Sequence, residues 1–244
     1  MEEVHQRAGQ QQQVDPVAGD MAPVLAQHVK PCDQCSRRQR HAGWAPPEGV
    51  SLNSLTGLQA VLDGLCDISS RDALTGLANR RQFEVAISRE IDRVARAGEP
   101  ALLLVLDIDH FKRINDQYGH MVGDTVLKNL SLFCQHKLRD IDVFGRFGGE
   151  EFLIACPETD AKAAFEIAER LREAISKDYF AIVNGKEITL TVSIGISIFD
   201  PKQVNHDSLD LAMDLYIDYS DKAMYCAKNA GRNQVKLFDE GMIS

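Results

Sequence analysis

Two groups of carboxylates in this sequence have the residue types and placement to bind a divalent cation. The first is Asp107-Ile108-Asp109, which ends the apolar run of residues 101–106. In an extended chain, side chains two positions apart point the same way, so Asp107 and Asp109 share a face. Carboxylates held together repel unless a cation lies between them or one is protonated, and hard oxygen ligands of this kind suit Mg²⁺. Asp109 taken alone is better explained as the N-cap of a helix that begins at His110.

The second group is Gly148-Gly149-Glu150-Glu151, which lies between two apolar stretches. The glycine pair permits a tight turn and the close approach of another backbone or a phosphate. Adjacent glutamates at such a turn are either exposed solubilising charge or metal ligands. Together with Asp107 they predict a site for two divalent cations and a polyphosphate. A chain with 36 acidic and 27 basic residues needs such local neutralisation to hold an anionic substrate.

Two further clusters have the chemistry to recognise a nucleotide. Asn115 offers a donor and an acceptor, and Asp124 accepts hydrogen bonds, so the pair could contact a guanine edge; turn chemistry with a helix cap is the alternative. Lys228 and Arg232 lie around the expected end of a helix. There they would either bind phosphate or complement the helix dipole.

The first fifty residues predict a poorly structured segment. Residues 1–50 contain a run of four glutamines and five of the eight prolines, without sustained periodicity. Such a segment buries too little apolar surface to offset the entropy of ordering. Its candidate zinc ligands, in an unusual order, are His28, Cys32, Cys35 and His41. The alternative is a mobile segment with two free thiols.

Residues 51–70 change character and predict an amphipathic helix. Leucines recur at three- and four-residue intervals, at Leu55, Leu58, Leu62 and Leu65. This spacing suits either a short coiled coil or a helix packed on its own domain. We expect a helical stalk through which two copies of the chain dimerise.

Residues 71–240 alternate helix and strand patterns, which predicts one α/β domain with a mixed sheet covered by helices. Asn184-Gly185 between two strand patterns predicts a β-hairpin. The expected helices are residues 82–96, 121–138, 160–176 and 208–228. The expected strands are residues 101–107, 142–146, 151–156, 179–183, 187–199 and 234–238.

Composition excludes several classes of protein. The longest apolar run, residues 101–106, is far shorter than the roughly 20 residues that a membrane helix needs, so we expect no membrane span. The polar N-terminus has no secretory pattern, and we expect a cytoplasmic protein. The net charge of −9 argues against broad nucleic-acid binding. Four of the six cysteines stand singly in apolar surroundings and are expected to be core residues.

Five blocks of this sequence resemble, in order and at ordinary spacing, the signatures of the GGDEF family of diguanylate cyclases. The blocks are DALTGLANRR (72–81), DIDHFKRINDQYGHMVGD (107–124), RFGGEEF (146–152), TVSIGIS (191–197) and DKAMYCAKNAGRN (221–233). The resemblance covers about residues 68–240. It implies an α/β (α+β) fold, in which helices surround a mixed five-stranded sheet with a nucleotidyl-cyclase or ferredoxin-like core, preceded by the short stalk.

The resemblance also implies an activity and its ligands. Members of the family join two GTP molecules into cyclic di-GMP and release two pyrophosphates. The implied ligands of Mg²⁺, or of Mn²⁺ in its place, are Asp107, the Ile108 carbonyl, Glu150 and Glu151. Glu151 resembles either a metal ligand or the group that helps deprotonate the 3′-hydroxyl. Glutamate at position 150, where the family name has aspartate, keeps the ligand type.

The remaining implied contacts are to the nucleotide. Gly148 and Gly149 would let the α-phosphate approach. Asn115 and Asp124 resemble the guanine-reading pair, which favours GTP over ATP. The implied phosphate contacts are Lys112, Lys228 and Arg232.

Regulation is implied by a motif that precedes the glycine turn. Arg139 and Asp142 match the family's RxxD product-inhibition motif, and Arg170 is a further expected contact to cyclic di-GMP. A surface ion pair is the alternative explanation. Because each domain would hold one GTP, catalysis implies a homodimer through residues 51–70, and a regulatory protein that binds the N-terminal stalk could order it. A domain that senses cyclic di-GMP without making it, and a scaffold that recruits a partner through its stalk, are the competing functions.

Overall fold

The computed structural model describes residues 69–199 and 209–243. The predicted unstructured segment 1–50, its candidate zinc ligands and nearly all of the predicted stalk 51–70 lie outside these residues. None of the helices within the described ranges is long and apolar enough to cross a membrane.

A five-stranded mixed sheet forms the centre of the domain, in the strand order β2-β3-β1-β6-β7. The central strand β1 is antiparallel to β3 and β6, β2 is antiparallel to β3, and β7 is parallel to β6. The mixed sheet predicted from the sequence is thereby confirmed. The strands are β1 (Ala101–Ile108), β2 (Val143–Arg146), β3 (Glu151–Cys156), β6 (Val192–Phe199) and β7 (Val235–Leu237).

Strand β1 explains why the sheet has a core on both faces. Every one of its residues is buried, and alternate side chains enter opposite cores because the side-chain period of a strand is two. Leu102, Leu104 and Leu106 join one apolar cluster, whereas Leu103 and Val105 join the other. An apolar run without alternation is what a strand buried on both faces requires.

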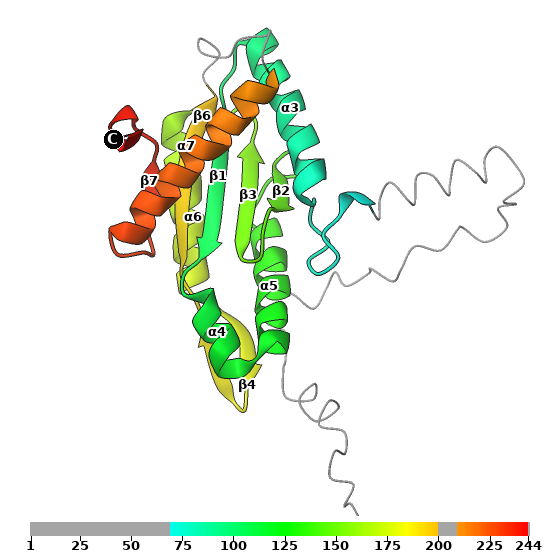
Figure 1. The fold of residues 1–244 in the computed structure, drawn as a ribbon, viewed down its shortest axis with the longest axis vertical. Coiled ribbons are helices and arrows are strands. Elements are labelled where there is room, and N and C mark those ends of the chain that lie inside the picture. The colour runs from blue at the N-terminus through cyan, green and yellow to red at the C-terminus, as the bar shows by residue number, and fades with distance from the viewer. Residues whose placement is uncertain (1–68, 200–208, 244) are drawn as a thin grey trace, which may run out of the picture.

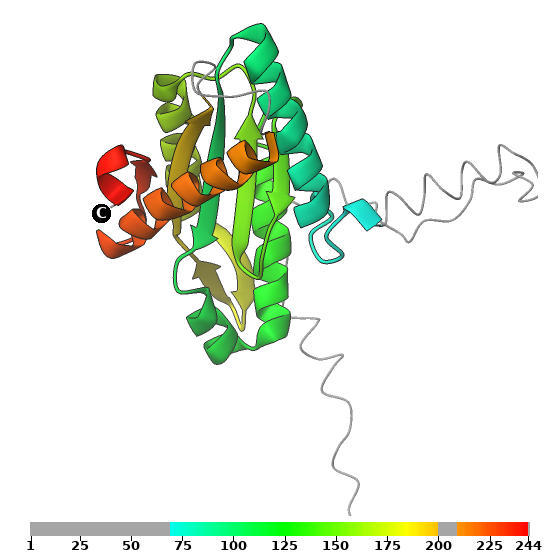
Figure 2. The ribbon, with the colours of Figure 1, turned by 45° about the horizontal axis from the view of Figure 1, so that its top comes forward.

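Helices cover both faces of this sheet (Figures 1 and 2). Helices α3 and α7 lie on one face, where Phe83 and Ile87 pack with Leu103, Tyr216 and Met224. Helices α5 and α6 supply apolar side chains to the cluster on the other face. The helices and the final 3₁₀ turn η3 are α3 (Arg80–Ala97), α4 (Phe111–Tyr118), α5 (His120–Gln135), α6 (Ala161–Ser176), α7 (Leu209–Asn229) and η3 (Glu240–Ile243).

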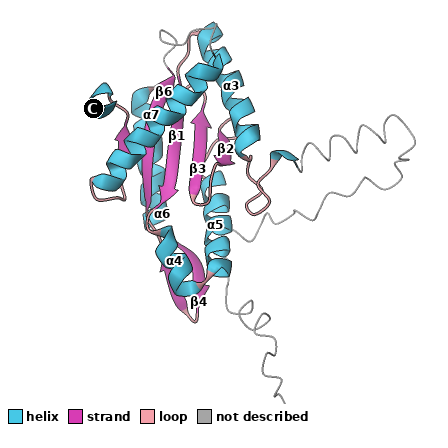
Figure 3. Ribbon diagram, viewed as in Figure 1, coloured by secondary structure: helices cyan, strands magenta, loops and turns pink. Residues whose placement is uncertain are grey.

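The predicted hairpin at Asn184-Gly185 is confirmed, but it belongs to a separate two-stranded sheet (Figure 3). Strand β4 (Tyr179–Val183) pairs with β5 (Lys186–Thr189), and the two turn residues have φ values of 52° and 76°. The prediction of one strand over residues 187–199 was therefore wrong. The chain turns a corner between β5 and β6, because β5 pairs with β4 whereas β6 pairs with β1.

Side-chain capping explains where two of the helices begin. The Asn79 side chain accepts from the Gln82 amide, so α3 begins two residues before the predicted start. Asp160 caps α6 in the same way. The predicted cap at Asp109 was wrong: the N-cap of α4 is His110, with φ 57° and no side-chain capping bond. Helix α4 itself is short, and only its start was predicted from the sequence, at His110, one residue before the observed start at Phe111.

Of the four cysteines expected to be core residues, Cys66 lies outside the described residues, and the expectation is confirmed for Cys134 and Cys156 but not for Cys226. Cys134 and Cys156 are buried and Cys226 is half-buried. Burial raises the pKa of the Cys156 thiol, which lies beside Asp142 and Arg139. The two buried thiols are therefore small side chains of the core.

Candidate active site

The carboxylates singled out from the sequence meet at the end of β1. Asp107 lies opposite Glu151 in the register of β1 and β3, and the Ile108 amide donates to the Glu150 carbonyl at 3.4 Å. Asp107 is buried at 4% exposure, and Glu150 and Glu151 are half-buried. Antiparallel pairing thus brings two groups that are distant in the sequence to adjacent positions.

This cluster is short of positive charge. Burial raises the pKa of Asp107; the Lys228 ammonium opposes that rise, whereas Glu151 and Asp109 add to it, and the pKa stays above its usual value. Burial together with the Asp107 charge also raises the pKa of Glu150. The Nζ atom of Lys228 lies 2.9 Å from the Asp107 Oδ2 atom. Added positive charge would stabilise the ionised cluster further.

The donor set suits a hard divalent cation. Among the described residues, no three His, Cys, Asp or Glu side chains are gathered as a metal site in the present arrangement. The available donors are instead the Asp107 and Glu150 carboxylates and the Ile108 carbonyl. Lys228 already pairs with the Asp107 carboxylate, which would also bind the ion. Oxygen donors from few side chains, completed by substrate phosphates, are the set that Mg²⁺ prefers, so the residues fit this ion.

Arg146 holds the glycine turn in place. Its Nε atom donates to the Gly148 carbonyl at 3.1 Å and its Nη2 atom to the Gly149 carbonyl at 2.6 Å. Its Nη1 atom forms an ion pair with Asp72 at 3.1 Å. The sequence motifs contain both Arg146 and Asp72, but sequence reasoning assigned neither of them a role. Only the tertiary structure shows that the first turn of the domain is tied to the glycine turn.

The Asp72 carboxylate is itself well coordinated. It accepts from the amide and the hydroxyl of Thr75, at 2.8 and 2.6 Å. Burial alone would raise the pKa of Asp72, but the hydrogen bonds from Thr75 and Arg146 outweigh it and hold the pKa below its usual value.

The predicted guanine-reading pair lies on the hairpin of α4 and α5. The Asn115 side-chain oxygen occupies the space that a Cβ atom on Gly123 would need. Gly123 directly precedes Asp124 in the chain. Asn115 is half-buried and Asp124 is exposed. Lys112 is 86% exposed and pairs with Asp116 at 3.5 Å. The structure therefore places the Asn115 side chain against Gly123, the residue before Asp124, and leaves Lys112 at the surface.

One cation in the last turn of α7 and one in the turn that follows it lie near the acidic cluster. Lys228 reaches Asp107, as described above. Arg232 is exposed, in a turn where its φ is 64°. Both residues thus lie at the end of the sheet that carries the carboxylates.

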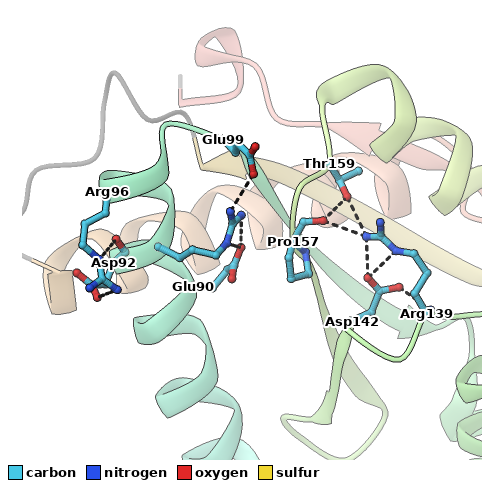
Figure 4. A network of polar contacts seen from close by, with 9 residues as sticks. Glu90, Asp92, Arg96, Glu99, Arg139, Asp142, Pro157 and Thr159 are labelled. Atoms are coloured by element: carbon cyan, nitrogen blue, oxygen red, sulfur yellow. Dashed lines mark hydrogen bonds and ion pairs between the residues drawn. The ribbon is translucent and has the colours of Figure 1, made fainter.

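Arg139 and Asp142 form an ion pair with each other (Figure 4). The Arg139 Nη2 and Nε atoms donate to Asp142 Oδ1 at 2.8 and 3.1 Å. Nη2 also donates to the Pro157 carbonyl and to the Thr159 hydroxyl, both at 3.0 Å. The Arg139 side chain remains 46% exposed. Arg170 lines a small cavity with Lys137, which is close to Arg139 in the chain.

The fold and the site define a class: an α/β domain whose central strand carries a carboxylate to an acidic glycine turn, beside groups suited to a nucleotide. The sequence profile described as "Diguanylate cyclase, GGDEF domain" matches residues 69–234. The chain belongs to the GGDEF family.

Curated relatives carry the same family name. The chain is 40% identical over 166 residues to "Diguanylate cyclase DgcP" of Pseudomonas aeruginosa, which covers 68% of this chain and 23% of that protein. It is 35% identical over 195 residues to "Probable diguanylate cyclase DgcC" of Escherichia coli strain K12, covering 80% and 49%. The chain spans less than half the length of these relatives.

Solved structures agree with the fold. The coiled coil and GGDEF domain of DgcB from Caulobacter crescentus, in complex with c-di-GMP, has a TM-score of 0.66 at 27% identity, covering 74% of this chain and 91% of that one. The diguanylate cyclase SiaD from Pseudomonas aeruginosa, in complex with its activator SiaC, has a TM-score of 0.64 at 31% identity, covering 75% and 66%. An active GGEEF domain from Vibrio cholerae has a TM-score of 0.59 at 33% identity, covering 67% and 99%.

We expect Asp72→Asn to destabilise the domain in a pH-dependent way. Because the pKa of Asp72 is lowered in the folded state, its contribution is complete above the unfolded pKa and disappears as the pH falls below about 4. Urea denaturation from pH 7 to pH 3 should show the variant converging on the parent. The exposed Asp140→Asn serves as control and should match the parent at pH 7. A difference that is independent of pH would contradict the role of the Asp72 charge.

We expect Gly123→Ala to displace Asn115 and to raise the dissociation constant for GTP about tenfold, which corresponds to one lost hydrogen bond to a base. The new methyl group would collide with the Asn115 side chain and crowd the Phe111 ring. The free energy of unfolding should change little, because the gain in helix propensity from glycine to alanine, about 1 kcal/mol, offsets the cost of this crowding. Calorimetric titration measures the affinity, with the exposed Lys128→Ala on the same helix as control. Unchanged affinity would show that Asn115 does not contact the base.

Proposed function

We propose that this chain is a diguanylate cyclase, which condenses two GTP molecules into cyclic di-GMP and releases two pyrophosphates. The observation that carries the proposal is the pairing of Asp107 with Glu151 across β1 and β3, beside Glu150 and the Gly148-Gly149 turn. The names of the curated relatives support the same reaction. The acidic motif that a purely sensing domain would lack is intact.

The reaction needs charge neutralisation, an activated hydroxyl and in-line attack. Asp107, the Ile108 carbonyl and Glu150 would hold Mg²⁺, or Mn²⁺ in its place, and the bound ion would neutralise triphosphate charge. Glu151 either completes this ligand set or accepts the proton of the 3′-hydroxyl. The Gly148-Gly149 turn, which Arg146 holds by its carbonyls, leaves room for the α-phosphate.

The remaining side chains bind and orient the nucleotide. Lys228 can exchange its pairing with Asp107 for phosphate oxygens, because a flexible ammonium group binds either anion. Arg232 and Lys112, both exposed, are the further phosphate contacts. Asn115 and Asp124 read the guanine edge and favour GTP.

Two copies must act together in this mechanism. Each domain holds one GTP, and each new bond joins the 3′-oxygen of one nucleotide to the α-phosphate of the other. We therefore propose a homodimer through residues 51–70, which raise the effective concentration of the two sites. The coiled coil of DgcB supports a stalk of this kind, and the complex of SiaD with its activator SiaC supports regulation by a second protein.

The decisive experiment incubates purified protein with GTP and Mg²⁺ and measures cyclic di-GMP by chromatography. Glu151→Gln should lower the rate by at least about a hundredfold, because the amide can neither accept the proton nor carry the charge. Circular dichroism checks that the variant is folded. The matched control is Glu166→Gln, exposed on α6, which should retain the parent rate. Full activity in Glu151→Gln, or no product from the parent, would overturn the proposal.

We further propose that Arg139, Asp142 and Arg170 bind the product and lower activity. The half-exposed Arg139 guanidinium has donors in a planar fork that suits phosphate. The DgcB complex with c-di-GMP supports a product-binding site in the family.

Arg139→Ala should relieve product inhibition and raise the inhibition constant about tenfold or more, because a charge-assisted contact is lost. Initial rates at increasing cyclic di-GMP concentrations measure this constant. Thermal unfolding checks that the substitution does not destabilise the domain, since Arg139 also donates to Pro157 and Thr159 in the loop after β3. Arg96→Ala, exposed on α3, should be inhibited like the parent. Inhibition of Arg139→Ala at the parent concentration would contradict the regulatory site.

A further inference from the structure

Asp109 is a buried carboxylate that neither the cap prediction nor the proposed chemistry explains. It is 6% exposed, and its Oδ1 atom accepts from the Ser193 hydroxyl at 2.7 Å. Its Oδ2 atom accepts from the Thr191 hydroxyl at 2.7 Å and from the Asn233 amide at 2.9 Å. All three hydrogen bonds come from neutral donors.

These donors belong to segments that are far apart in the sequence. Thr191 and Ser193 stand at the corner where β6 begins, and Asn233 follows α7. The Asp109 amide also donates to the Thr191 carbonyl at 2.9 Å. Asp109 therefore joins the end of β1, the start of β6 and the turn after α7 at one point. A capping residue would bond only to its own helix.

The turn that Asp109 contacts is conformationally demanding. Gly231, Arg232 and Asn233 have consecutive φ values of 117°, 64° and 46°. Residues other than glycine rarely adopt a positive φ. Such backbone conformations persist only where contacts with the surrounding structure hold them in place. Asp109 supplies one restraint through the Asn233 amide. The Arg172 guanidinium supplies another, donating to the Asn233 side-chain oxygen at 2.9 Å.

The same turn carries cations toward the acidic cluster. It begins after Asn229, the last residue of α7, one position beyond Lys228, which pairs with Asp107, and it contains Arg232. Asp107 and Asp109 are two residues apart on one strand end. The anchor of the turn and the carboxylate of the cluster therefore share one rigid piece of backbone.

We propose that Asp109 is a positioning residue that holds the turn after α7, residues 230–233, against the carboxylates, and so sets where Lys228 and Arg232 meet the triphosphate. The phosphate-binding role of these two cations rests on the proposed function. The attachment of the turn to Asp109 stands on the hydrogen bonds alone.

The first test measures amide hydrogen exchange of the full chain by mass spectrometry. In Asp109→Ala, residues 229–234 should exchange about tenfold faster than in the parent, because a hydrogen bond to a charged acceptor is lost. Asp109→Asn keeps the shape and one oxygen acceptor, so its acceleration should be smaller but confined to the same residues. Ser193→Ala removes only the bond to Oδ1 and should leave the turn unchanged. Exchange in β3 should be equal in all of these proteins.

Two outcomes of this test would overturn the proposal. The first is parent-like exchange of residues 229–234 in both Asp109 variants. The second is acceleration spread evenly over the domain, which would mean that Asp109 supports only global stability. If Asp109→Ala does not fold, the isosteric Asp109→Asn decides between these outcomes by itself.

The second test separates phosphate positioning from general damage. Calorimetry compares GMP with the α,β-methylene analogue of GTP, which cannot release pyrophosphate. Asp109→Ala should weaken the triphosphate analogue about tenfold and GMP less than about twofold, because only the longer ligand reaches both cations. Asp109→Asn should recover most of this loss. Equal weakening of both ligands, or none, would overturn the positioning role, whereas a parent chain that makes no cyclic di-GMP would overturn the proposed function alone.

Discussion

The domain depends on one electrostatic constraint: carboxylates packed at the end of a buried strand must be compensated. Asp107, Glu150 and Glu151 meet where β1 and β3 pair, and burial raises the pKa of both Asp107 and Glu150. The Lys228 ammonium supplies part of the missing charge from the end of α7. Apolar clusters on both faces of β1 maintain this arrangement, because they fix the strand that delivers Asp107. The stable sheet thus holds several negative charges close together. Such a group of carboxylates suits a divalent cation, which can in turn bind a polyphosphate.

Loops at the site are held by polar contacts to strand ends. Arg146 binds the carbonyls of the glycine turn and pairs with Asp72, so the first turn of the domain is coupled to the acidic motif. Asp109 binds the amide of Asn233 and so restrains the turn after α7. In both cases a charged side chain satisfies backbone groups of an irregular segment, which would otherwise have to find water as their partner.

The sequence-based predictions succeeded where local patterns carry the information. The alternation of helix and strand, the mixed sheet and the hairpin at Asn184-Gly185 follow from periodicity and turn chemistry. They were wrong where hydrogen-bonding partners that are distant in the sequence determine the local structure. Residues 187–199 are continuously strand-like, yet the chain changes sheet between β5 and β6 because the hydrogen-bonding partners differ. Asp109 has the type and position of a helix cap, but its oxygens bond to Thr191, Ser193 and Asn233 instead.

The amino-acid sequence alone identifies the side chains that are available for chemistry: acidic ends of two strand-like segments, a glycine turn, an Asn–Asp pair and cations at a helix end. These are properties of residue type and short spacing, which a linear chain displays directly. The folded arrangement was needed to show that Asp107 faces Glu151 and that Lys228, rather than a more exposed cation, reaches Asp107. It was also needed to show that Arg146 and Asp109 hold the two turns. Those contacts depend on the register of antiparallel strands and the packing of α7 on β6, which arise only when distant segments compete for the same hydrogen bonds and the same buried surface.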